Sequence, residues 1–295
     1  MIPWDWPWRP GVGLLLVTVG AVYVRGWVRL RRRSRGRLRS TWRLAAYLGG
    51  LLTIALALMS PVDRLAELLF AAHMVQHQLL LMLAPPLLLL GNPVPPILWG
   101  LPPPLRRAVG GSLARGGHLR RALRRLTWMP VAGAVYSLNL WLWHLPAAYQ
   151  AALGHAPLHD LEHLAFFGAA LLFWWPVIGP APRWEARRGT IYYGLRIVYV
   201  ILVTAQNTLL GAVIGLTERV LYPWYAATTP RVFDLSPLDD QALGGGIMWS
   251  GSHMYLVALL ILVGYAMDAE GRRGPVSLPP GQPIPRAPHG VWGQK

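Results

Sequence analysis

The stretch L-A-E-L-L-F-A-A-H-M-V-Q-H-Q-L-L-L-M-L-A-P-P-L-L-L-L, residues 65–90, joins a long apolar run to two histidines four positions apart. A helix needs about 20 mostly apolar residues to cross a lipid bilayer. Similar apolar stretches recur at 11–28, 42–60, 128–146, 157–178, 190–217 and 242–266. The pattern predicts an all-α integral membrane protein, a seven-transmembrane helix bundle over residues 1–266 with a disordered, Pro/Gly-rich tail over 267–295.

The composition supports a membrane protein and excludes every site that needs cysteine. Charged residues make up 14% of the 295-residue chain and hydrophobic residues 54%, with a mean hydropathy of +0.36. A soluble domain usually carries about 25% charged residues. The chain has no cysteine, which excludes a disulfide scaffold, thiolate catalysis and cysteine-bound iron–sulfur clusters.

The Lys and Arg residues that give the chain its positive charge are concentrated in alternate loops. The net charge is +16, and 22 of the 28 Lys and Arg residues lie within 29–43, 106–125, 183–188 and 272–295. These segments alternate with loops that are poor in Lys and Arg, as expected for cytoplasmic segments. We therefore expect the N-terminus to lie outside and the C-terminus to lie in the cytoplasm. We also expect the lipid bilayer to surround the chain and no nucleic acid to be its partner. The proline-rich run 91–104 predicts a stiff, irregular linker.

Seven of the nine histidines fall on the outer side in this topology. They are His73, His77, His144, His155, His159, His163 and His253. Ionisable groups at membrane depth are costly and usually face a protein interior or a functional site. Residues i and i+4 share one helix face, so His73 with His77 and His159 with His163 each aim two imidazoles in one direction.

The direction of three helices supports a shared histidine site. The stretches 65–90, 157–178 and 242–266 all run from outside to inside in this topology, so they can present His73, His77, His163 and His253 to one centre. Ordinary hydrogen bonds between helices are the alternative for each single histidine. Two spaced pairs and a third helix favour a metal site, because imidazole is the commonest metal ligand.

The neighbouring residues favour copper. Imidazole suits Zn, Cu, Fe and Ni, whereas thioether sulfur favours Cu(I), and Met74 and Met254 each adjoin a histidine. Asp160 and Glu162 either orient metal-bound imidazoles or are acids favoured at a helix start. The glycines of segment 244–246 permit close helix packing or an irregular backbone.

Three motifs together resemble the CtaG family of multi-span assembly factors for caa-type cytochrome c oxidases. They are H-M-V-Q-H-Q-L-L-L-M-L-A-P-P-L-L-L-L-G (73–91), L-H-D-L-E-H-L-A-F-F-G-A-A-L-L-F-W-W-P-V-I-G (158–179) and D-Q-A-L-G-G-G-I-M-W (240–249) with His253. The resemblance runs from about 42 to 266.

The resemblance implies a protein of the bacterial plasma membrane that helps to build the copper site of the oxidase catalytic subunit. It implies copper, as Cu(I), held towards the extracytoplasmic side, and it makes a soluble extracytoplasmic copper chaperone a further partner. The residues it singles out are His73, His77, His159, His163 and His253, with Asp240 and Gln241.

Three other functions stay open at this stage. His159, Glu162 and His163 match the H-x-x-E-H pattern of inverted zinc proteases, with Glu162 as the base. Two histidines from different helices can also ligate haem iron. A copper permease needs polar groups through the whole depth, which the inner half does not offer. We expect a metallochaperone or assembly factor rather than an enzyme.

Overall fold

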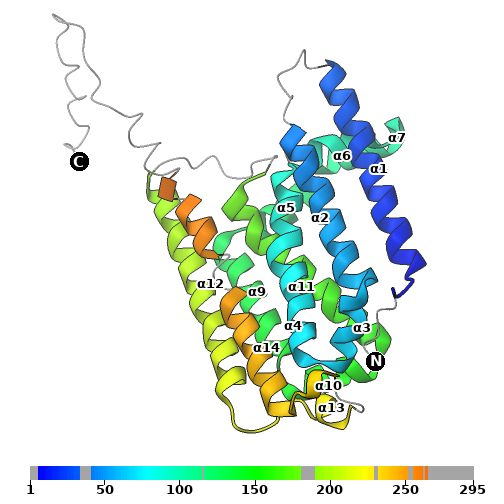
Figure 1. The fold of residues 1–295 in the computed structure, drawn as a ribbon. Coiled ribbons are helices and arrows are strands. Elements are labelled where there is room, and N and C mark those ends of the chain that lie inside the picture. Colours follow the sequence, from blue (N-terminus) through cyan, green and yellow to red (C-terminus); the bar gives the residue numbers. More distant parts are fainter. Residues whose placement is uncertain are drawn as a thin grey trace, which may run out of the picture.

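The computed structural model describes residues 6–33, 41–114, 116–180, 190–228, 232–251, 255–261 and 263–264. Every regular element among them is a helix, as predicted (Figure 1). The predicted tail over 267–295 lies outside the described residues. Within the described part, six helical segments are long and apolar enough to cross a membrane: Pro10–Arg33, Thr41–Met59, Phe70–Leu90, Ala156–Ile178, Tyr192–Leu216 and Pro237–Ile261.

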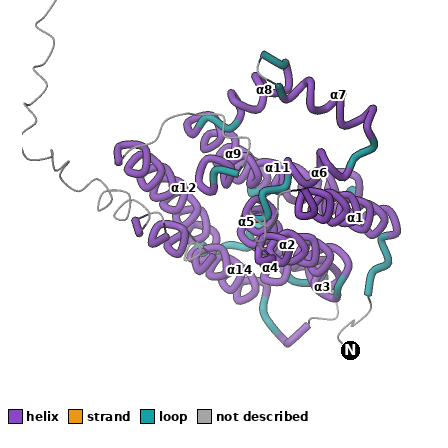
Figure 2. Tube along the Cα trace, turned by 90° about the horizontal axis from the view of Figure 1, so that it is seen from above, coloured by secondary structure: helices purple, strands orange, loops and turns teal. Residues whose placement is uncertain are grey.

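The central segments of the bundle are the ones that carry the paired histidines. They comprise α4 (Phe70–Gln78), a π-helical turn η1 (Leu79–Leu83), α5 (Ala84–Leu90) and α11 (Ala156–Ile178). About half or more of each central span is buried, against 17% for the span of α1 (Pro10–Arg33). Viewed end-on, α4 lies between α2 and α14 (Figure 2), and α5 packs on α2 and α11.

Four longer helices pack around this centre. α2 packs on α5, α14 packs on both α4 and α12, and α9 packs on α11 and α12. Their bounds are α2 (Thr41–Met59), α9 (Met129–Trp143), α12 (Thr190–Leu216) and α14 (Pro237–Gly251).

The predicted span 65–90 is not one continuous helix. The chain leaves α3 (Pro61–Leu68) and enters α4 through the extended residue Leu69. The π turn then precedes Pro85 and Pro86. A proline removes a backbone donor and crowds the carbonyl four residues earlier. That carbonyl, of Leu81, instead accepts a hydrogen bond of 2.9 Å from the indole of Trp174 on α11.

The prediction of a stiff, irregular linker over 91–104 is wrong. It contains a helix, α6 (Val94–Gly100), and α7 (Pro103–Leu113) begins within it. Proline is tolerated in the first helical turn, where no intrahelical donor is needed. α6 lies against α1 so closely that a Cβ on Gly26 would come 1.7 Å from the carbonyl oxygen of Pro96.

The predicted span over 128–146 contains a shorter helix, α9, which has 15 residues. At 1.5 Å per residue, such a helix covers roughly 22 Å, less than the hydrocarbon core of about 30 Å. The chain bends at His144 and Leu145 because Pro146 starts the next helix, α10 (Pro146–Gly154).

Short helices close one end of the bundle. α3, α10 and α13 (Pro223–Ala227) lie at the lower end in Figure 1, where α4 and α11 begin. The opposite end carries α6, α7 and the arginine-rich end of α1. Arg33 and Arg106 both stack on Trp99 there. The remaining short elements are α8 (His118–Leu126) and the 3-10 turn η2 (Val232–Asp234).

Candidate metal centre

Two histidines on α4 form the first half of the site. His73 and His77 are both buried, with 0% and 2% of their surface exposed. They lie one turn apart on the same face of the helix, as their spacing predicts. Their Nε2 atoms are 2.9 Å apart, and the ring centroids are 4.3 Å apart. The pair therefore points both imidazoles at one position.

The start of α11 supplies the second half. His159 is half-buried, whereas His163 and Glu162 are buried. The rings of His159 and His163 are 4.3 Å apart between centroids. Glu162 directs Oε1 to within 3.8 Å of His77 Nε2. These residues enter the site because α11 begins beside the N-terminal turns of α4.

The two helices bring their imidazoles together in matched pairs. Ring centroids are 5.2 Å apart for His73 and His159, and 5.6 Å apart for His77 and His163. Ligand atoms of His73, His159 and His163 all lie within 4.8 Å of one another. The same limit holds for His73, His77 and Glu162. Either set offers three donors converging on a space the size of one metal ion.

The donors are largely unsatisfied by the protein itself. Within the described residues, several buried atoms of the cluster lack a hydrogen-bond partner: His77 Nδ1, His159 Nε2, His163 Nδ1, His163 Nε2, Glu162 Oε1 and Glu162 Oε2. Leaving a buried polar group without a partner costs about 1–3 kcal/mol. A bound cation offsets this cost, so the donor set fits a metal ion.

His144 is a member of the cluster that its sequence context does not reveal. It directly follows α9, is 5% exposed, and its ring centroid is 6.0 Å from that of His77. Its Nδ1 is 2.8 Å from the carbonyl oxygen of Leu140, so Nδ1–H donates, and within the described residues Nε2 has no partner. The sequence places His144 on the outer side, but it has no second histidine one turn away.

Two buried tyrosines, Tyr225 on α13 and Tyr149 on α10, contact the cluster through their hydroxyl groups. The Tyr225 hydroxyl donates to the carbonyl of Ala66 at 3.1 Å and lies 2.9 Å from His73 Nδ1. Tyr149 adds its hydroxyl 3.1 Å from that of Tyr225. Burial raises the pKa of the Tyr225 hydroxyl well above its ordinary value. Tyr225 therefore keeps its proton and remains a hydrogen-bonding partner of His73.

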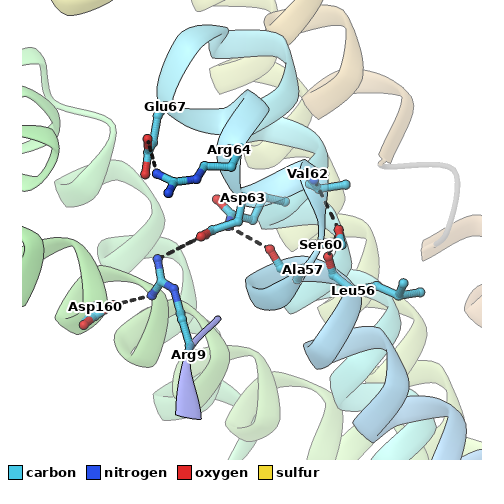
Figure 3. Close-up of polar contacts among 10 residues, drawn as sticks. Arg9, Leu56, Ala57, Ser60, Val62, Asp63, Arg64, Glu67 and Asp160 are labelled. Atoms are coloured by element: carbon cyan, nitrogen blue, oxygen red, sulfur yellow. Dashed lines mark hydrogen bonds and ion pairs between the residues drawn. The ribbon is translucent and has the colours of Figure 1, made fainter. Parts of the chain in front are cut away.

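Asp160 belongs to an ion-pair group at the edge of the cluster. Arg9 bridges it to Asp63, with contacts of 2.8 Å to Asp160 Oδ1 and 3.0 Å to Asp63 Oδ2 (Figure 3). Asp63 is buried and also accepts a hydrogen bond of 2.7 Å from Gln76. Gln76 lies next to His77 on α4, so this group supports the site where it meets α3. Asp63 could not be identified from local sequence spacing, because its partner Arg9 lies 54 positions away.

Asp240 and Gln241 hold the backbone around the site. The Asp240 carboxylate accepts hydrogen bonds from the backbone N–H groups of Phe70 and Ala71, at 2.8 and 2.9 Å. It therefore caps the N-terminus of α4, where a negative charge is stabilised. Gln241 accepts from the N–H of Leu221 and donates to three carbonyls near the end of α12.

Of the two methionines named as possible ligands, Met74 lies within the described residues and is part of the packing between helices. Met74 is fully buried and packs where α14 crosses α4, since a Cβ on Gly244 would lie 3.3 Å from its Cγ. His253 and Met254 lie outside the described residues. The donors that the structure brings together are thus imidazole nitrogens and one carboxylate. His155 is exposed, at the junction of α10 and α11.

Comparison with known proteins gives a family. Uncharacterized proteins of Mycobacterium leprae (strain TN) and Mycobacterium tuberculosis (strain CDC 1551 / Oshkosh) are each 25% identical to the chain, over 87% and 91% of it. The chain spans only 38% and 40% of their lengths. No solved structure gives a significant match. The model of the family described as cytochrome c oxidase caa3 assembly factor (Caa3_CtaG) matches residues 21–268, so the chain belongs to this family.

Proposed function

We propose that the protein binds a copper ion at the histidine cluster of α4 and α11 and helps to place it in the catalytic subunit of a caa-type cytochrome c oxidase. The observation that carries this proposal is the convergence of four imidazoles and Glu162, with most of their ligand atoms unpaired in the described part of the chain. Membership of the assembly-factor family supplies the oxidase as the target.

Copper is the metal best suited to these donors. Imidazole ligands suit copper, and sites of nitrogen and oxygen ligands bind Cu(II) more tightly than the other divalent metals of the first row. With no cysteine in the chain, soft thiolate ligands are excluded. Cu(I) is favoured because a single positive charge costs less to bury among neutral imidazoles than a double charge. Exchange of histidine ligands then suffices for transfer, with no covalent step.

The proposal includes an orientation in the plasma membrane of a bacterium. We take α9 as a short seventh crossing, with the N-terminus outside and the C-terminus in the cytoplasm. The arginine-rich end of α1, together with α7 and α8, marks the cytoplasmic side. The cluster lies at the opposite end of the bundle, where it faces the extracytoplasmic side. A soluble copper chaperone can deliver the ion there.

Copper analysis of purified protein tests the proposal. We expect wild type to retain copper, and the double variant His73→Ala plus His77→Ala to lose it. His155→Ala is the matched control, because His155 is exposed outside the cluster, and it should keep the wild-type content. Equal copper in wild type and double variant would overturn the proposal.

A metal-dependent hydrolase is the second candidate. The H-x-x-E-H pattern needs a third metal ligand, and the structure brings His73 to His159 and His163. In that case Glu162 is the base. Glu162→Gln should then abolish peptide cleavage with zinc still bound. A chaperone shows no cleavage in either form.

Haem binding is the less suitable alternative. The Nε2 atoms of His73 and His77 are 2.9 Å apart, and the facing rings of α4 and α11 are 5–6 Å apart between centroids. A porphyrin does not fit among rings in such contact. We therefore expect no Soret band in the purified protein.

A further inference from the structure

The histidine cluster contains two sets of three donors rather than one. One set is His73, His159 and His163, and the other is His73, His77 and Glu162. The sets differ in exposure, because His159 is half-buried whereas all members of the second set are buried. We call them the half-exposed position and the buried position. A single residue, His73, belongs to both.

The hydrogen bonds of His73 limit how it can serve the two sets. The Tyr225 hydroxyl has one hydrogen, which it donates to the carbonyl of Ala66. It therefore accepts from His73 Nδ1–H, 2.9 Å away. Nδ1 of His73 is thus protonated, and Nε2 carries the ring's one lone pair for a metal ion, which accepts from His77 Nε2–H, 2.9 Å away, while no ion is bound. Since one lone pair binds one ion, the two positions are alternatives.

The two positions also differ in charge. The half-exposed position has three neutral imidazoles, whereas the buried position includes Glu162, which supplies a negative charge once a cation replaces its proton. Within the described residues, both Glu162 oxygens lack a hydrogen-bond partner. A buried carboxylate without a partner is unfavourable, and a cation beside it relieves that cost. The electrostatics therefore draw a cation from the half-exposed position to the buried one.

We propose that one copper ion occupies two alternative positions in this protein, entering at His73, His159 and His163 and moving to His73, His77 and Glu162. His73 stays bound through Nε2 while the other two ligands are exchanged. The neutral position receives the ion, and the carboxylate position holds it until transfer. This inference rests on the proposed function, since it concerns the same ion and the same cluster.

Copper affinity in a set of variants tests the inference. Wild type, His159→Ala, Glu162→Gln, the double variant of these two, and His73→Ala are compared by competition with a chromophoric Cu(I) chelator, bicinchoninate. Each single variant of His159 or Glu162 keeps one complete position, so its affinity should stay within about tenfold of wild type. His73→Ala and the double variant have no complete position, so each should lose about a hundredfold or more, and the loss in the double variant should exceed the product of the two single losses.

Matched controls separate these effects from general damage. His155→Ala and Glu67→Gln remove an exposed imidazole and an exposed carboxylate at the same end of the bundle, and both should bind as wild type. Glu162→Asp keeps the carboxyl group. Its copper affinity should therefore lie closer to that of wild type than the affinity of Glu162→Gln does.

Two results overturn the inference alone. In the first, the losses from His159→Ala and Glu162→Gln simply multiply in the double variant, as expected for one undivided site. In the second, wild type binds two copper ions at saturation. A wild type that binds no copper instead overturns the proposed function itself, and the inference with it.

Discussion

At the scale of single residues, the site depends on the hydrogen-bond acceptor that orients each imidazole. Metal-bound histidines usually donate their second ring N–H to a fixed acceptor, which sets the tautomer and the ring orientation. Tyr225 is that acceptor for His73, and the carbonyl of Leu140 is the acceptor for His144. Tyr222 supports this arrangement by donating to the carbonyl of His144 at 2.9 Å. The loop between α12 and α14 thus prepares ligands that belong to other helices.

The substitution Tyr225→Phe tests this role. It removes the acceptor of His73 Nδ1–H and retains the aromatic ring. We expect Cu(I) affinity to fall about 10- to 100-fold, the usual cost of losing such a partner. Chelator competition measures the change, with Tyr193→Phe near the start of α12 as the control. Unchanged affinity in Tyr225→Phe would show that His73 does not depend on this hydroxyl.

The same scale shows what sequence reasoning could find. The spacing of His73 with His77, and of His159 with His163, was enough to predict that each pair shares a face. The participation of His144, Tyr225 and Asp63 could not be read from spacing. Tyr225 meets His73 across 152 positions of the chain, and contacts of that kind follow from packing rather than local pattern.

At the scale of elements, close helix contacts position the histidines. The predicted role of segment 244–246 in close packing is met at two of its three glycines. A Cβ on Gly245 would lie 2.4 Å from the backbone nitrogen of Gly215 on α12, and a Cβ on Gly244 would lie 2.2 Å from Phe70 on α4. Gly246 has open space around it. α14 therefore fits between α12 and α4, where it brings Asp240 to the start of α4.

A glycine pair tests this packing. Gly245→Ala forces the backbones of α14 and α12 apart, so we expect a loss of about 1–3 kcal/mol in the free energy of unfolding, as for other overpacked sites. Gly246→Ala is the control and should be neutral or slightly stabilising, because alanine favours helix over glycine. Denaturant unfolding in detergent compares the two. Equal stability of both variants would contradict the assigned contact.

Backbone hydrogen bonding and the positions of prolines explain where the predicted elements differ from the observed helices. An apolar pattern gives the length of a span, but it does not show the break at Leu69 or the π turn before Pro85. Both depend on how individual backbone groups find partners, as Leu81 does with Trp174. Likewise, prolines over 91–104 predict a linker, although Pro95 and Pro96 fall in the first turn of α6, where a helix accepts them.

At the scale of the whole molecule, the arginine-rich segments and the histidine cluster occupy opposite ends of the bundle. The described arginine-rich segments of α1, α7 and α8 lie away from the histidine cluster. Under the positive-inside rule, this separation predicts that the cluster faces outward. It also explains why a net charge of +16 does not require a nucleic-acid partner.

The absence of cysteine makes the orientation directly measurable. Single cysteines at His155 and His118, both exposed, report on opposite ends of the molecule without background labelling. In intact cells, a membrane-impermeant maleimide should label His155→Cys and should reach His118→Cys only after the membrane is opened. The reverse pattern would invert the proposed topology.

The most direct test of the copper site is a structure of the copper-loaded protein with anomalous scattering measured at the copper edge. The account predicts one copper peak per chain, bonded to His73 Nε2 and to ligands from the His159–His163 or His77–Glu162 pair. A copper peak away from His73, or loaded protein with no ion in the cluster, would contradict it.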